Sequence, residues 1–164
     1  MSEVFKISTF LTDEEKYQVL LSQIKFLLTK DELLLSNLSN CTAALKQTFD
    51  KISWVGFYLF DGEKLYLGPF QGKVACTKIE LGKGVCGTSA LKKETIIVRD
   101  VNTFLGHIAC DDGTNSEIVI PILKGNELIG VLDLDSYQFN AFSEIDKKYL
   151  EELSKFLAEE IFVN

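Results

Sequence analysis

Ser53-Trp-Val-Gly-Phe-Tyr-Leu-Phe60, followed by Asp61-Gly62 and by Lys64-Leu-Tyr-Leu-Gly-Pro-Phe70, is the stretch that indicates the fold class. Two runs rich in aromatic and aliphatic side chains are typical of β-strands. Asp-Gly between such runs is a favoured pair at the tight turn of a hairpin. The stretch therefore predicts two antiparallel strands joined by a short turn.

Four further short apolar runs follow this predicted hairpin. They lie at residues 74–79, 95–98, 117–123 and 128–135, and each has a length typical of strands. The last two runs are joined by Lys-Gly-Asn-Glu, which is a second hairpin signal. The sequence thus predicts about six strands, most of them antiparallel.

Helical patterns flank the predicted strands on both sides. Thr12-Asp-Glu-Glu15 is a capping-box pattern and precedes apolar side chains at helical spacing over residues 13–29. A second helix is predicted over residues 31–49, with Asp31 as its cap. Ser143 begins the last helix, which is predicted to run to about residue 161.

This order of elements predicts an α+β fold. Its mostly antiparallel sheet of about six strands carries the N- and C-terminal helices on one face. A chain of 164 residues fits one domain, which we expect to span residues 1–164. Its parts are N-terminal helices at about 13–49, a sheet core at about 53–136 and a C-terminal helix at about 143–161.

Charge and composition exclude several classes of partner. The net charge of −7 and the sequence pI of 4.8 argue against nucleic acid or an anionic membrane surface. The N-terminus lacks a basic segment followed by an apolar one, so no secretory signal is indicated. We therefore expect a cytoplasmic protein. Its four cysteines are better interpreted as free thiols than as structural disulfides. Wide cysteine spacing and a single histidine make a structural zinc site a poor interpretation.

The polar stretch Gly106-His-Ile-Ala-Cys-Asp-Asp-Gly-Thr-Asn-Ser-Glu117 gathers the groups best suited to chemistry. It contains Cys110, the only histidine and three carboxylates, and it has no apolar periodicity. Its glycines and short polar side chains predict a loop held at the start of a buried strand. We interpret Cys110 as a nucleophile whose loop forms one wall of a small polar pocket.

Gly82-Lys-Gly-Val-Cys-Gly87 has the glycine spacing of a dinucleotide-binding loop, but no parallel βαβ unit surrounds it. These glycines could instead bring backbone N–H groups together at a helix start, where an anion is stabilised. Cys86 would then have a lowered pKa. A tight turn with a packed cysteine explains the same residues equally well. Cys41, on an apolar helical stretch, is interpreted as a small buried hydrophobic residue.

Two pairs of residues at strand spacing are further candidates. Trp54 and Tyr58 lie four residues apart and share one face of a regular strand. Packing in the core is the favoured interpretation of this pair alone, and an apolar wall around a thioether-like group is the alternative. Asp133 and Asp135 also share a face, opposite Leu132 and Leu134. Two neighbouring carboxylates need a cation or a retained proton, and a ligand ammonium group would serve.

These segments together resemble the GAF-domain free methionine-(R)-sulfoxide reductases. The resemblance is carried by residues 54–59 (Trp-Val-Gly-Phe-Tyr-Leu), 67–76 (Leu-Gly-Pro-Phe-Gln-Gly-Lys-Val-Ala-Cys), 82–88 (Gly-Lys-Gly-Val-Cys-Gly-Thr), 106–111 (Gly-His-Ile-Ala-Cys-Asp), 115–119 (Asn-Ser-Glu-Ile-Val) and 129–136 (Ile-Gly-Val-Leu-Asp-Leu-Asp-Ser). It covers about residues 15–160. Asp112-Gly-Thr114 is the part of the central loop that least matches the family.

The resemblance implies an activity and a role for each cysteine. Cys110 corresponds to the attacking cysteine of the family, Cys76 to its main resolving cysteine and Cys86 to an auxiliary one. The implied reaction reduces free L-methionine-(R)-S-oxide through a sulfenic acid and an intramolecular disulfide, which thioredoxin recycles. The implied pocket residues are Trp54, Tyr58, Glu117, Asp133 and Asp135. Glu117 and Asp135 are the implied proton donors.

The resemblance implies no metal or organic cofactor, and its members are commonly homodimers. Two alternatives remain open from the residues. The chain could be a GAF sensor that binds a small molecule without chemistry, or a thiol peroxidase or redox switch that uses the same cysteines.

Overall fold

The computed structural model describes residues 5–108 and 110–163. Its centre is a six-stranded sheet in the order β3-β2-β1-β6-β5-β4, in which every neighbouring pair is antiparallel. The strands are β1 (Trp54–Phe60), β2 (Lys64–Gln71), β3 (Lys78–Glu80), β4 (Ile96–Val98), β5 (Ser116–Lys124) and β6 (Glu127–Ser136). The predicted α+β class and both predicted hairpins are confirmed.

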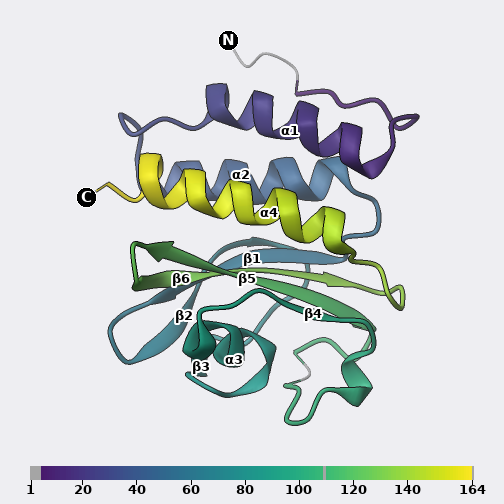
Figure 1. The fold of residues 1–164 in the computed structure, drawn as a ribbon, viewed down its shortest axis with the longest axis vertical. Helices are drawn as coiled ribbons and strands as arrows, with labels where there is room; N and C mark the ends of the chain where they lie inside the picture. The colour runs from purple at the N-terminus through teal and green to yellow at the C-terminus, as the bar shows by residue number, and fades with distance from the viewer. Residues whose placement is uncertain (1–4, 109, 164) are drawn as a thin grey trace.

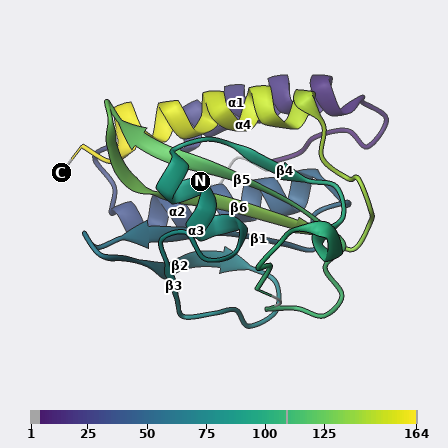
Figure 2. The same cartoon turned by 60° about the horizontal axis from the view of Figure 1, so that its bottom comes forward.

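Helices lie on both faces of this sheet, as Figure 1 shows. One face carries α1 (Asp13–Leu27), α2 (Leu34–Thr48) and α4 (Glu144–Phe156). A π-helical turn, η2 (Leu157–Ile161), extends α4. The opposite face carries the short helix α3 (Gly84–Lys92), which Figure 2 brings forward, and the 3-10 turn η1 (Val101–Thr103) precedes the Cys110 loop. No helix of the described part of the chain is long and apolar enough to cross a membrane.

Two separate apolar cores follow from this arrangement. Leu132 and Leu134 face α1, α2 and α4 in the larger core, and Trp54 and Tyr58 belong to the smaller core on the α3 face. The alternation along β6 therefore directs Asp133 and Asp135 toward the α3 side, as expected for a strand. The face that carries α1, α2 and α4 therefore holds the larger apolar core. The α3 face holds the smaller core together with the polar side chains of a candidate site.

The helix caps only partly follow the predictions. Thr12 completes a capping box, as predicted, and Ser143, predicted only as the start of the last helix, completes a second one. Asp31 does not cap α2, which begins after Leu33 without a side-chain cap. Asn37 instead bonds the backbone of Thr29 through both its side-chain oxygen and its nitrogen, and so fixes the connection from α1.

The predicted strand at residues 74–79 is wrong in extent. Only Lys78–Glu80 pairs with β2, and Val74 is 88% exposed. The preceding residues instead contact the α3 side of the sheet, where Val74 and Ala75 line a pocket and Cys76 is bonded to Cys110. A tertiary contact has here overridden a local strand preference.

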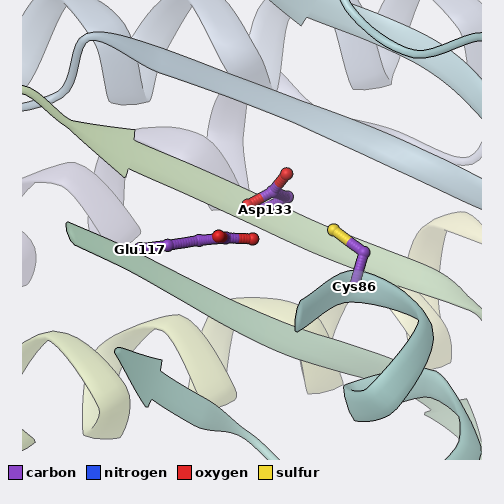
Figure 3. Close-up of side chains that lie close together, drawn as sticks. All are labelled: Cys86, Glu117 and Asp133. Carbon is purple, nitrogen blue, oxygen red and sulfur yellow. The ribbon is translucent and has the colours of Figure 1, made fainter. Parts of the chain in front are cut away.

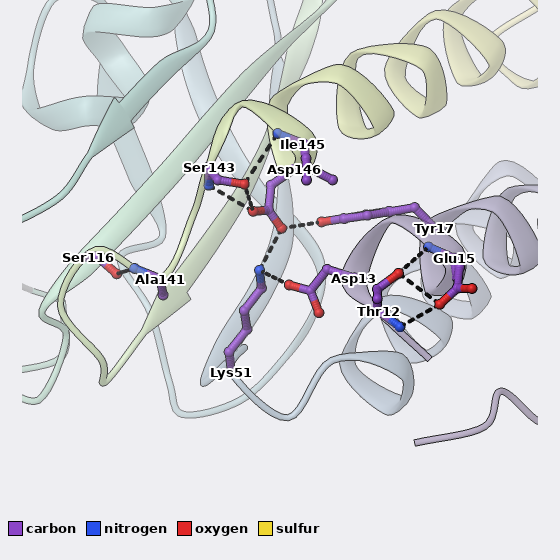
Figure 4. A network of polar contacts seen from close by, with 10 residues as sticks. All are labelled: Thr12, Asp13, Glu15, Tyr17, Lys51, Ser116, Ala141, Ser143, Ile145 and Asp146. Carbon is purple, nitrogen blue, oxygen red and sulfur yellow. Dashed lines mark hydrogen bonds and ion pairs between the residues drawn. The ribbon is translucent and has the colours of Figure 1, made fainter. Parts of the chain in front are cut away.

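A buried polar network holds the helical layer to the sheet. Lys51 lies just before β1, and its Nζ is 2.6 Å from Asp13 and 2.7 Å from Asp146 (Figure 4). The Tyr17 hydroxyl donates to the same Asp146 carboxylate at 2.8 Å. Asp146 is 1% exposed, so this paired charge positions α1 and α4 against the start of β1.

Candidate active site

The register of three central strands brings the predicted pocket residues together. Trp54 pairs with Asp135 across β1 and β6, and Glu117 pairs with the same Asp135 across β5 and β6. Asp133 lies two residues along β6, opposite Gly56. Side chains directly opposite one another share a face, so the four side chains converge on the α3 side.

A pocket lies between these strands, the start of α3 and the Cys110 loop. It is partly open to solvent. Its lining includes all of the predicted site residues except Cys76: Trp54, Tyr58, Cys86, Cys110, Glu117, Asp133 and Asp135. A cavity of this kind, with convergent polar groups on an aromatic wall, is typical of a small-molecule site.

Cys76 and Cys110 form a disulfide at the edge of this pocket. Their Cα atoms are 5.9 Å apart across a sequence separation of 34 residues. Cys110 is exposed and Cys76 is half-buried. The Tyr58 hydroxyl donates to the Cys76 carbonyl oxygen at 3.0 Å and ties that segment to β1. The expectation of mostly free thiols thus holds for Cys41 and Cys86, whereas the other two are bonded.

The Cys110 loop is held by Asp111. The Asp111 carboxylate accepts hydrogen bonds from the Gly113 N–H at 3.0 Å and the Tyr137 hydroxyl at 2.8 Å. Lys73 Nζ lies 3.1 Å from it and links the loop to the segment that carries Cys76. The Gly113 and Tyr137 hydrogen bonds lower the pKa of Asp111. The segment before β5 is a loop in its described residues, as predicted, and Ala109 lies outside them.

The aromatic pair forms the apolar wall. The ring centroids of Trp54 and Tyr58 are 6.1 Å apart, and both residues are nearly fully buried. Trp54 Nε1 donates to the Lys73 carbonyl oxygen at 3.0 Å, so the ring is oriented by the Cys76 segment. Both interpretations of this pair hold at once, because the two side chains belong to the smaller core and also line the pocket.

Three carboxyl groups share this buried space. Burial raises the pKa of Glu117, Asp133 and Asp135 well above the usual values, and repulsion from a neighbouring carboxylate raises each further. Asp133 Oδ1 is buried without a hydrogen-bond partner among the described residues. Such a cluster is complete only with protons or with a cation from outside the protein.

Cys86 does not have the lowered pKa considered for it at the helix start. Its thiol is 4% exposed, and burial together with Asp133 and Glu117 raises its pKa well above the usual value. Desolvation and negative neighbours therefore outweigh the dipole of the short helix α3. Figure 3 shows the thiol facing the two carboxylates, and one donor atom of each residue lies within 4.8 Å of the others. These donors could hold a divalent cation. Cys41 is fully buried in the larger core, where burial raises its pKa to about 12.

His107 and Thr114 are among the pocket residues for which the sequence predicted no role. His107 Nε2 lies 3.5 Å from Glu117 Oε2, and burial lowers the pKa of this imidazole. Thr114 is 7% exposed, and its hydroxyl has no hydrogen-bond partner in the described structure. The sequence signal for a role of these two residues was their position within residues 106–117, the stretch that contains Cys110. Hydrophobic periodicity does not show in which direction a loop side chain points.

Comparison with known proteins places this fold and pocket in a known family. Residues 36–161 match the family model described as GAF domain. The chain therefore belongs to the GAF-domain family, whose six-stranded antiparallel sheet with N- and C-terminal helices it shares.

Within that family the chain is closely related to free methionine-R-sulfoxide reductases, which are oxidoreductases. It is 43% identical over 139 residues to the free methionine-R-sulfoxide reductase of Escherichia coli (strain K12), covering 85% of this chain and 84% of the relative. The protein of the same name from Saccharomyces cerevisiae is 44% identical over 158 residues, covering 92% and 88%. The X-ray structure of the Neisseria meningitidis enzyme in complex with its substrate is 41% identical, covers 95% of each chain and has a TM-score of 0.88.

Proposed function

We propose that this chain reduces free L-methionine-(R)-S-oxide to L-methionine, with Cys110 as nucleophile and thioredoxin as the final reductant. The observation that carries the proposal is the Cys76–Cys110 disulfide at the edge of an aromatic and acidic pocket. A disulfide in that place is the state expected after one turnover, before a reductant has acted. A sensor without chemistry would not need this pair.

The pocket offers a partner for each part of the free amino acid. Trp54 and Tyr58 provide an apolar wall for the methylthio end of the substrate. Asp133 is assigned the ammonium group, because its buried Oδ1 lacks a partner that a cation would supply. Burial of both ends excludes a sulfoxide within a polypeptide, because the flanking peptide bonds could not be accommodated.

Protonation of the sulfoxide oxygen makes its sulfur electrophilic. Glu117 and Asp135 are the proposed donors, because burial raises the pKa of both, repulsion from Asp135 raises that of Glu117 further, and repulsion from Asp133 raises that of Asp135 further, which favours a retained proton. Glu117 and Asp135 are paired across β5 and β6, so both can reach a group bound at the same place. We infer that one proton shared between them is delivered to the oxygen.

The proposed reaction then proceeds in two balanced steps. The Cys110 thiolate attacks the sulfoxide sulfur while its oxygen takes up the donated proton, so Cys110 Sγ and a hydroxyl group are both bound to the substrate sulfur. The hydroxyl group then moves to Cys110 Sγ as the bonds from the substrate sulfur to Cys110 and to oxygen break; Cys110 is oxidised to a sulfenic acid, and the substrate sulfur is reduced to the thioether of methionine, which leaves with the electron pair. Cys76 condenses with this sulfenic acid to form the disulfide and releases water. Thioredoxin restores both thiols by exchange, and exposure of Cys110 gives its thiolate a point of attack. Cys86 is assigned an auxiliary role in recycling.

Single-turnover chemistry tests the assignment of the cysteines. Pre-reduced protein is mixed with excess R sulfoxide without reductant, and released methionine is measured by amino-acid analysis. The Cys110→Ser protein should release none. The Cys76→Ser protein should release roughly one equivalent and then turn over poorly with thioredoxin.

The controls separate this activity from its alternatives. The Cys41→Ala protein should behave as wild type, because Cys41 lies in the other core. The S epimer and hydrogen peroxide are supplied separately, since a peroxidase would prefer peroxide and a sensor would consume no thiol. Full turnover by the Cys110→Ser protein would rule out the proposed nucleophile.

A further inference from the structure

Buried polar groups without a partner mark places where a ligand completes the structure. Five side-chain atoms in the described structure are buried in this way. Only two of their residues line the active-site pocket, Asp133 and Thr114. Asp133 is already assigned to the substrate ammonium group, whereas the Thr114 hydroxyl has no assigned role.

Thr114 lies in the same turn as the proposed nucleophile. Its backbone N–H donates to the Asp111 carbonyl oxygen at 3.1 Å, which closes a tight turn directly after Cys110. Its neighbour Asn115 donates to the Ser136 carbonyl oxygen at 2.8 Å and so fixes the end of the turn against β6. Thr114 therefore lines the same pocket as Cys110, and its turn is held by backbone hydrogen bonds that do not involve its hydroxyl.

We propose that the Thr114 hydroxyl donates a hydrogen bond to the oxygen of the bound sulfoxide, and that Thr114 is a further catalytic residue. The inference rests on the proposed function and specifies which group receives the substrate oxygen. The oxygen is one bond away from the sulfur that Cys110 attacks, so it must lie near the Cys110 turn. Thr114 keeps its own proton, and Glu117 or Asp135 supplies the proton that is transferred.

The chemistry explains why a hydroxyl suits this position. Negative charge builds up on the sulfoxide oxygen as the thiolate approaches, and a fixed neutral donor stabilises that charge. A lysine would pair permanently with the nearby carboxylates and abolish their retained protons. A hydroxyl donates without changing the charge of the cluster. It also leaves the free enzyme with an unsatisfied buried group that only the substrate satisfies.

This inference predicts opposite effects on stability and on rate. Thr114→Val removes a buried hydroxyl that has no partner, so the thermal midpoint should stay unchanged or rise. The same substitution should slow single-turnover release of methionine by roughly tenfold or more, because a donor to the transition state is lost. Thr114→Ser keeps the donor and should retain most of the rate. A merely structural role would lower rate and stability together.

The matched control is Ser154→Ala. Ser154 is 3% exposed and its hydroxyl also lacks a partner among the described residues, but it lies on α4, away from the active-site pocket. This variant should share the unchanged or higher thermal midpoint of Thr114→Val and keep the wild-type rate. The comparison isolates the position of the hydroxyl from the general effect of removing a buried polar group.

Binding measurements identify the substrate atom involved. In a Cys110→Ser background, titration calorimetry compares methionine (R)-sulfoxide with methionine, which lacks the oxygen. Thr114→Val should weaken sulfoxide binding by roughly tenfold and leave methionine binding unchanged. Equal losses for both ligands, or a wild-type single-turnover rate, would overturn the inference. Failure of the otherwise unaltered protein to form methionine would instead overturn the proposed function.

Discussion

Reduction of the Cys76–Cys110 disulfide is expected to lower the free energy of unfolding substantially. The bond closes a loop with a sequence separation of 34 residues. The chain-entropy relation for a loop of that length gives roughly 4 kcal/mol at 25 °C, because the cross-link restricts the unfolded chain. With a urea dependence of about 2 kcal/mol per molar, the unfolding midpoint should fall by about 2 M on reduction.

The assay is urea unfolding of oxidised and reduced protein, followed by circular dichroism at a pH low enough to suppress thiol exchange. In the Cys76→Ser protein the reductant should have no effect, since the cross-link is absent. In the Cys41→Ala protein the full difference should remain. Equal midpoints for oxidised and reduced wild type would refute the reasoning, and would show that the bond stores strain comparable to the entropy it removes.

Two further predictions concern the electrostatics and the packing of the pocket. Burial and a neighbouring carboxylate raise the pKa of Asp133 in the folded protein above its value in the unfolded chain. The contribution of Asp133 to stability is therefore fully present below the unfolded pKa and is lost as pH rises toward the folded pKa. Asp133→Asn should therefore reduce the fall in thermal midpoint as pH rises above the unfolded pKa of about 4, and an unchanged slope would contradict the assignment. Gly56→Ala would place a Cβ against the Trp54 ring and 2.6 Å from Phe70 Cβ, which is closer than real Cβ contacts. We expect a shift in the emission of this single tryptophan and a loss of about 1–3 kcal/mol of folding stability from overpacking. Unchanged emission would show that the ring is not displaced.

The helices and the central hairpin were predictable because local patterns determine them. The capping boxes at Thr12 and Ser143 satisfy backbone groups within a few residues, so the same residues act in the same way in the fold. Alternation along residues 132–135 likewise requires only a strand with one apolar face. The prediction of an Asp31 cap was wrong because α2 begins only after Leu33, and Asn37 bonds the Thr29 backbone in the preceding connection. The start of this helix was not visible as a periodic pattern.

The chemistry of Cys86 could not be predicted from its neighbours in sequence. Its glycine-rich context suggested a stabilised thiolate, but Asp133 and Glu117 approach it from β6 and β5. Electrostatic energies depend on distance in space and on burial, and neither is set by the residues next to a group in the chain. The partners that raise its pKa lie more than 30 residues away in sequence.

The sequence by itself determined the α+β class, the nature of the site residues and the stretch that carries Cys110, because strand alternation, caps and turn residues act over short range. Only the tertiary structure decided that residues 72–76 leave the sheet, that Cys76 meets Cys110, and that three carboxyl groups share one pocket with a threonine hydroxyl that has no partner in the described part of the chain. The physical reason is strand register. A shift of one residue in pairing would turn these side chains to the opposite face, and register depends on contacts between segments far apart in the chain.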